Sequence, residues 1–60
     1  MTTKRVLVAD DSEAIREMLG SFLASLGYHT DLAADGRVAV DFFRANPYDV
    51  VICDLQMPTS

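Results

Sequence analysis

Hydrophobic and polar positions alternate along the chain in blocks that predict a run of short secondary-structure elements. The apolar, β-branched run Arg5–Ala9 is typical of a strand buried on both faces. Ser12 then provides a helix N-cap, and hydrophobic residues recur at spacings of three and four until Gly27, a natural helix stop. The predicted apolar face of this first helix consists of Ile15, Met18, Leu19, Phe22, Leu23 and Leu26.

The second part of the chain repeats this order more weakly and ends on a strongly apolar segment. Tyr28–Ala33 alternates polar and apolar residues, which predicts a strand suited to the edge of a sheet. Asp35 and Gly36 open a second helix, which ends near Asn46-Pro47 because proline disfavours helix in the residue before it. Asp49–Asp54 predicts a third strand, which is apolar from Val50 to Cys53. The apolar side of the second helix is expected to contain Ala39, Val40 and Phe43, widened by Val38 and Phe42.

The order strand, helix, strand, helix, strand predicts an α/β domain with a parallel sheet. Right-handed crossovers and an outer position for the weak second strand give the spatial order 2-1-3, with the two helices on opposite faces. Ligands of such sheets bind beyond the carboxyl ends of the strands, at the gap between the first and third. The residues expected there are Asp10, Asp11 and Asp54.

Composition limits the range of functions. Sixty residues form at most one small domain, here residues 1–60, and the single cysteine excludes an internal disulfide framework. The net charge is −4, and no Lys/Arg run is longer than Lys4-Arg5, which argues against nucleic-acid binding by this segment. No segment has the length of a membrane span or the pattern of a secretory signal, so a cytoplasmic protein is expected.

Three carboxylates at one crevice repel each other unless a cation lies among them. Mg²⁺ prefers oxygen ligands and often shares its coordination shell with phosphate, which points to phosphoryl chemistry with a carboxylate nucleophile. Taken alone, Asp10-Asp11 is equally well explained as a solvated loop or helix cap. Asp54 shifts the balance towards a functional site, because an acid that ends a buried apolar strand needs a reason.

The chain resembles the receiver domain of bacterial two-component response regulators. The resemblance lies in the strand ending in Asp10-Asp11, in Asp35-Gly36 with Ala39 downstream, and in the segment from Asp54 through Gln56 to Met57-Pro58. It covers all 60 residues and implies the N-terminal βαβαβ half of a flavodoxin-like receiver fold. The ordered set of motifs is specific, although each dipeptide alone is not.

The resemblance implies a role for each matched residue. Asp54 would accept a phosphoryl group from a sensor histidine kinase or a phosphotransfer protein. Asp11 and Asp54 would bind Mg²⁺ directly, Asp10 would bind it through a water molecule, and the backbone carbonyl of Gln56 would complete the protein ligands. The domain would be a signalling switch and not a turnover enzyme.

A complete receiver would also have two more strands and three more helices, which supply a Ser/Thr hydroxyl and a lysine to the phosphoryl group. Lys4 is the only lysine of this chain and precedes the first strand, so it cannot take that role. In a complete receiver the third strand would be internal, and without the next strand it would be an exposed apolar edge. An isolated half-domain without competent chemistry therefore remains an alternative, as a homo-oligomer associated through its third strand. A phosphatase with an aspartate nucleophile is a weaker one, because Asp10-Asp11-Ser12 lacks the usual Asp-x-Asp spacing.

Overall fold

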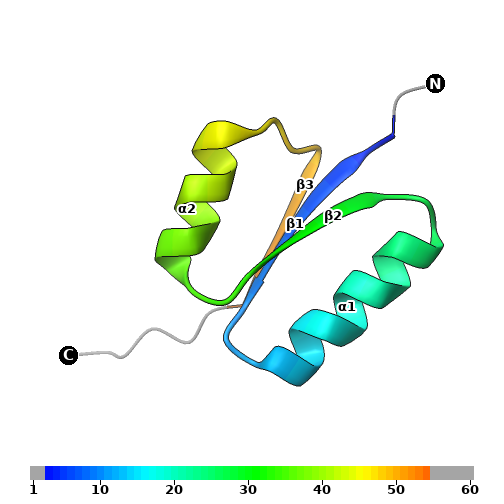
Figure 1. Cartoon of the computed structure of the whole chain (residues 1–60), viewed down its shortest axis with the longest axis horizontal. Helices are drawn as coiled ribbons and strands as arrows, with labels where there is room; N and C mark the ends of the chain where they lie inside the picture. Colours follow the sequence, from blue (N-terminus) through cyan, green and yellow to red (C-terminus); the bar gives the residue numbers. More distant parts are fainter. Residues whose placement is uncertain (1–2, 55–60) are drawn as a thin grey trace.

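The computed structural model describes residues 3–54, and these residues form the five predicted elements in the predicted order. Figure 1 shows how the elements follow one another along the chain. Their bounds are β1 Arg5–Asp10, α1 Glu13–Ser25, β2 His29–Ala33, α2 Gly36–Ala45 and β3 Val50–Asp54.

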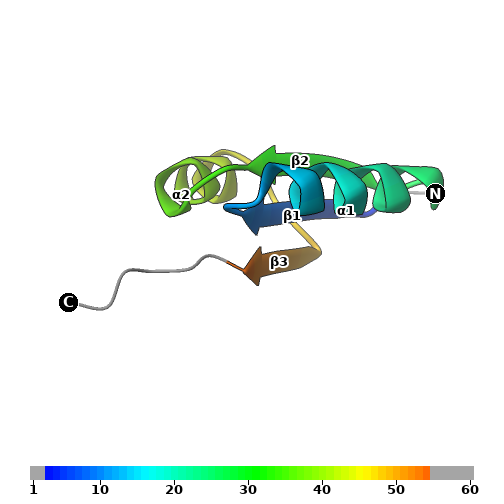
Figure 2. The ribbon, with the colours of Figure 1, turned by 90° about the horizontal axis from the view of Figure 1, so that it is seen from below.

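The strands form one parallel sheet in the order β2-β1-β3, which confirms the predicted topology. All three arrows point the same way in Figure 2, with β1 in the middle. The register places Arg5 opposite His29 at the amino end of the sheet, and Asp10 opposite Asp54 at its carboxyl end. The carboxyl ends of β1, β2 and β3 therefore lie along the same edge of the sheet.

Alternating side chains of the central strand build two small cores, one on each face of the sheet. Val6 and Val8 pack with Leu23 of α1, whereas Leu7 and Ala9 pack with Ala33 on the face covered by α2. The helices accordingly lie on opposite sides of the sheet, as predicted (Figure 1). The β1 side chains from Val6 to Ala9 are at most 3% exposed, so β1 is buried on both faces.

Neither α1 nor α2 covers the third strand. Figure 2 shows α1 and α2 level with β2 and β1, whereas β3 extends beyond them. Val50 and Val51 are 48% and 44% exposed, and Ile52 alone in this strand packs against a core cluster. Among residues 3–54 β1 is the only neighbour of β3 in the sheet, so β3 is the exposed apolar edge expected of a half-domain that lacks the next strand.

The predicted apolar faces of the helices are also wider than the cores that they build. On α1 only Leu19 and Leu23 reach the core, and on α2 only Ala39 and Phe42 do. The reason is geometric: within residues 3–54 each helix packs over β1 and β2 and not over β3, so only part of its apolar stripe is covered by the sheet. The predicted face residues that remain exposed are Ile15, Met18, Phe22, Leu26, Val38, Val40 and Phe43.

Local sequence signals fix where the helices start and stop. Ser12 Oγ accepts from the Ile15 N–H, and Asp35 Oδ1 accepts from the Val38 N–H, so both helices have side-chain N-caps. At the end of α1, Gly27 adopts φ +90°, a backbone conformation that residues with a Cβ seldom adopt. Its N–H donates to Ala24 O while that of Tyr28 donates to Leu23 O, the hydrogen-bond pair of a Schellman motif.

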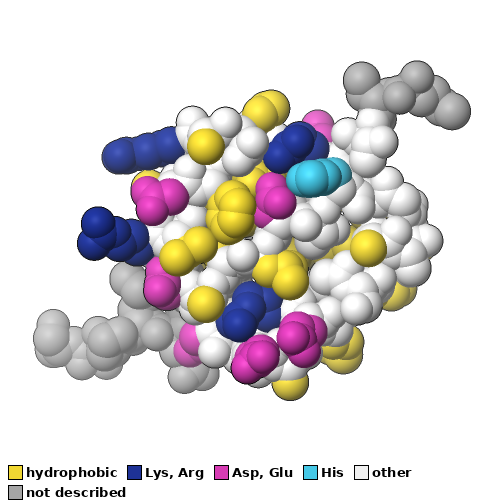
Figure 3. Space-filling view, in the orientation of Figure 1, with side chains coloured by type: hydrophobic (Ala, Val, Ile, Leu, Met, Phe, Trp, Pro, Cys, Tyr) yellow, Lys and Arg dark blue, Asp and Glu magenta, His cyan; other side chains and the backbone are white. Residues whose placement is uncertain are grey.

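The surface carries no continuous basic patch on the face shown in Figure 3, where Lys and Arg side chains are dispersed among Asp and Glu. Neither helix in residues 3–54 has the length and apolar character that crossing a membrane requires.

Candidate functional site

The two aspartates predicted to form the centre of the site lie side by side at the carboxyl ends of β1 and β3. Asp10 and Asp54 are the last residues of their strands and are register partners. Asp10 lies on the same face of β1 as Val6 and Val8, which pack against α1. Because register partners in a parallel pair point to the same face, the Asp54 side chain also starts from the α1 side of the sheet. The structure thus brings together two residues that are 44 positions apart in the chain.

Asp10 is the only buried charged residue among residues 3–54, at 3% exposure. Its Oδ1 accepts a hydrogen bond from the Ser12 N–H at 2.8 Å, which shapes the turn into α1. Its main-chain carbonyl accepts from the Arg16 guanidinium, also at 2.8 Å. Within residues 3–54 no hydrogen bond reaches Oδ2, so one carboxylate oxygen is left for a ligand or solvent.

The remaining predicted ligands lie in different surroundings. Asp11 follows Asp10 in the turn and is exposed, as is Asp54. Gln56 lies outside the described residues. Across residues 3–54 no three His, Cys, Asp or Glu side chains form a group that could hold a metal ion. The oxygen donors suit Mg²⁺ in kind, and their assignment as its ligands stays a prediction.

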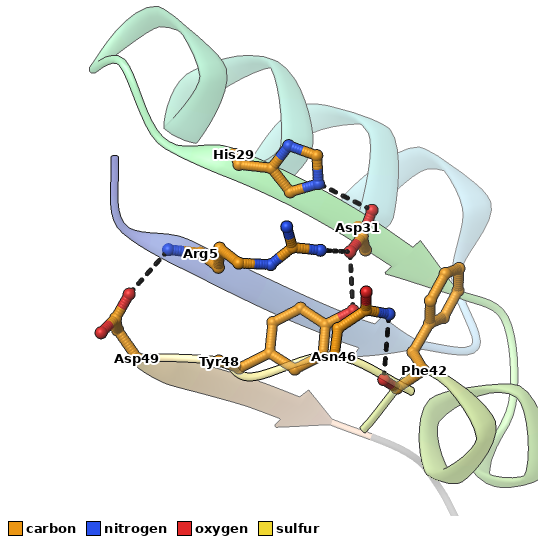
Figure 4. Close-up of polar contacts among 7 residues, drawn as sticks. All are labelled: Arg5, His29, Asp31, Phe42, Asn46, Tyr48 and Asp49. Atoms are coloured by element: carbon orange, nitrogen blue, oxygen red, sulfur yellow. Dashed lines mark hydrogen bonds and ion pairs between the residues drawn. The ribbon is translucent and has the colours of Figure 1, made fainter. Parts of the chain in front are cut away.

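A second polar cluster, which the sequence reasoning missed, lies at the opposite end of the sheet on the α2 face (Figure 4). Asp31 Oδ2 accepts from the Tyr48 hydroxyl at 2.6 Å and lies 3.4 Å from the Arg5 guanidinium. Asp31 Oδ1 lies 3.3 Å from His29 Nε2, and the Arg5 guanidinium carbon is 5.6 Å from the centre of the Tyr48 ring. One sequence signal could have indicated part of this cluster. His29 and Asp31 are two residues apart in a predicted strand, and such residues share a face.

The surroundings of Tyr48 raise its pKa above the ordinary value of 10.0. Burial is the largest cause, followed by the hydrogen bond to Asp31 and the negative charge of that carboxylate, whereas Arg5 opposes the shift. The protonated phenol is therefore favoured by the folded state.

A raised tyrosine pKa gives stability that is present at low pH and lost at high pH. The contribution is complete below the unfolded value of 10.0 and disappears as the pH rises through the folded value. The free energy of unfolding, measured by urea titration from pH 8 to about 11.5, should fall more steeply for the wild type than for Tyr48→Phe. Parallel pH profiles of the two proteins would contradict this assignment.

Comparison with known proteins identifies the family. The family model described as the response regulator receiver domain matches residues 6–60, and the chain belongs to this family of two-component signalling domains. The chain is 43% identical over 53 residues to response regulator RR06 of Streptococcus pneumoniae. It is 44% identical over 54 residues to response regulator MprA of Mycolicibacterium vanbaalenii. These matches cover 88% and 90% of the chain, but 24% and 23% of the two relatives.

Solved structures agree with the fold. The chemotaxis protein CheY4 of Vibrio cholerae superposes with a TM-score of 0.89 at 40% identity, over 95% of this chain and 48% of that protein. Response regulator TrrA of Thermotoga maritima, in complex with Mg²⁺-BeF, gives a TM-score of 0.85 at 45% identity over 93% and 49%. The chain thus has the flavodoxin-like receiver architecture and spans about half the length of these structures.

Proposed function

We propose that this segment is the phosphoacceptor part of a receiver domain, in which Asp54 takes a phosphoryl group from a phosphohistidine of a sensor kinase or phosphotransfer protein. An oxygen of the Asp54 carboxylate attacks phosphorus as the phosphorus–nitrogen bond of the donor breaks, and the electron pair returns to the imidazole. The product is an aspartyl phosphate. The domain acts as a switch and not as a turnover enzyme.

The observation that carries the proposal is the pairing of Asp54 with Asp10 at one strand end. Asp54 is exposed, so a partner's phosphohistidine can reach it, whereas Asp10 is buried and held by the Ser12 N–H. The exposed carboxylate of Asp54, which can act as the nucleophile, is therefore a neighbour of the buried, hydrogen-bonded carboxylate of Asp10. The family membership of residues 6–60 supports the same reading.

Mg²⁺ would be held by Asp10, Asp11, Asp54 and the carbonyl of Gln56, where it would supply positive charge to offset attack by an anion on an anion. The complex of the Thermotoga relative with Mg²⁺-BeF supports this choice of cation. The chain's own contribution is to hold the buried Asp10 at the end of β1 by the turn into α1 and to present the exposed Asp54 beside it at the end of β3.

The test is phosphorylation of the chain by acetyl phosphate with and without Mg²⁺, followed by intact mass. The proposal expects a Mg²⁺-dependent gain of one phosphoryl group, which peptide mapping places on Asp54. Absence of any gain would favour the alternative of a half-domain that lacks competent chemistry.

The exposed edge of β3 supports a second proposal, which concerns the chain's own copies. In this structure β3 is an edge strand with apolar side chains exposed on it, and such edges pair with other strands. We propose that isolated copies of this 60-residue segment associate through β3. Sedimentation should show a concentration-dependent rise in mass, which Val51→Lys, a charge placed on the strand, should suppress. A compact monomer at high concentration would overturn the proposal.

A further inference from the structure

Four residues connect the three strands of residues 3–54 near the amino-end side of the sheet. We call Arg5, Asp31, Tyr48 and Asp49 the amino-end clamp. The Asp49 N–H donates to the Arg5 carbonyl at 2.9 Å, and the Arg5 N–H donates back to Asp49 Oδ2 at 2.8 Å. Asp31 of β2 joins them, because its Oδ2 meets both the Tyr48 hydroxyl and the Arg5 guanidinium (Figure 4). The segment entering β3 is thereby held to β1 and β2 before the strand begins.

The apolar pattern of β3 does not itself specify how the strand aligns with β1. Register is set strongly where only one face of a strand is apolar, because a slip of one residue then exposes the apolar side chains. In β3 every residue from Val50 to Cys53 is apolar, so a slipped strand presents apolar residues to both faces again. β3 is also mostly exposed, and β1 is its single neighbour among the strands of residues 3–54. Another feature must choose the register.

We propose that the amino-end clamp sets the register of β3 against β1 and so positions Asp54 opposite Asp10. Asp49 can exchange its two hydrogen bonds with Arg5, while Tyr48 reaches Asp31, only when these residues are level with one another. Five residues further along the same strands, that alignment places Asp54 beside Asp10. The consequence for phosphorylation rests on the proposed function of Asp54, whereas the consequence for register does not.

A slip of one residue shows what the clamp prevents. Cys53 would then lie opposite Asp10, and the Asp54 side chain would turn to the α2 face of the sheet, because successive strand residues point to opposite faces. The nucleophile would no longer lie beside Asp10, although apolar residues of β3 would still face both sides of the sheet. Residues of the amino-end clamp are thus positioning residues for Asp54.

Tyr48→Phe tests this directly, because it removes one hydroxyl and keeps the ring next to Arg5. Tyr28→Phe is the matched control: it removes the chain's other tyrosine hydroxyl, which makes no hydrogen bond within residues 3–54, from a ring packed on the α1 face. Asp31→Asn is a milder second variant, since the amide keeps an acceptor oxygen for Tyr48 but loses the charge that attracts Arg5.

The primary measurement is NMR of backbone nuclear Overhauser effects between β1 and β3. Wild type and Tyr28→Phe should show contacts of Asp10 with Asp54. Tyr48→Phe should lose part of this intensity and gain Asp10–Cys53 contacts, with the ratio of native to slipped register falling roughly 2- to 10-fold, as expected for one hydrogen bond. Unchanged α1 chemical shifts would show that the rest of the domain is folded. If Tyr48→Phe does not fold, Asp31→Asn is judged by the same contacts.

Phosphorylation by acetyl phosphate gives the second measurement. Its rate should fall in Tyr48→Phe by the same factor as the native-register population, and it should not change in Tyr28→Phe. Native Asp10–Asp54 contacts at full intensity in a folded Tyr48→Phe protein would overturn the proposal. A wild type with the expected register that is not phosphorylated would instead contradict the function of Asp54 and leave the register result standing.

Discussion

Asp54→Asn is expected to abolish phosphorylation of the chain by acetyl phosphate, to the level of a reaction without protein. The substitution keeps the shape of the side chain at the end of β3 but replaces an anionic oxygen, the nucleophile, with a neutral amide. The exposure of Asp54 means that the change leaves no buried group without a partner, so the fold should persist. Intact mass after incubation with Mg²⁺ and acetyl phosphate measures the result.

Asp41→Asn is the matched control for that experiment. It makes the same chemical change at an exposed aspartate of α2, away from the strand ends, and phosphorylation should be unaffected. Continued phosphorylation of Asp54→Asn would assign the nucleophile elsewhere. Asp10 would be the first candidate, as in a phosphatase whose nucleophile follows the first strand, and peptide mapping of the product would identify it.

Leu7→Ala is expected to have the largest effect on stability. Leu7 is 1% exposed on the central strand and packs with Ala9 and Ala33 beneath α2. Truncation of a buried leucine costs about 2–5 kcal/mol, through lost burial and the cavity left behind. At roughly 0.05–0.15 kcal/mol per residue, a chain of 60 residues has a total stability of the same size. The variant should therefore be largely unfolded at 25 °C by circular dichroism.

Leu26→Ala is the matched control, because it distinguishes the effect of truncating a core leucine from the effect of truncating an exposed one. Leu26 caps α1 with its side chain 54% exposed, so the same truncation there should change the free energy of unfolding by less than about 1 kcal/mol. Equal destabilisation of the two variants in urea titrations would show that the described core does not carry the stability of the chain. A Leu7→Ala protein that remains fully folded at 25 °C would also show that the described core does not determine the stability of the chain.

The elements, their order and the topology could all be predicted from the amino-acid sequence. The signals are local: the apolar run of β1, the caps Ser12 and Asp35, and the helix stop at Gly27. Each one works through hydrogen bonds or backbone sterics between residues that are close in the chain. The weak pattern of β2 placed it at an edge of the sheet, and right-handed crossovers then placed Asp10 and Asp54 on neighbouring strands.

Which apolar residues form the core, and which contacts align the strands, depend on how the helices and strands pack together. Helical spacing puts Met18 and Leu19 on one stripe, but only Leu19 reaches the core, since the position of α1 over β1 and β2 makes that choice. Likewise, no local pattern joins Asp31 to Tyr48, 17 residues apart, because their hydrogen bond exists only after both crossovers have closed. Contacts between residues distant in the chain depend on the assembled sheet, and so does the register that sets Asp54 beside Asp10.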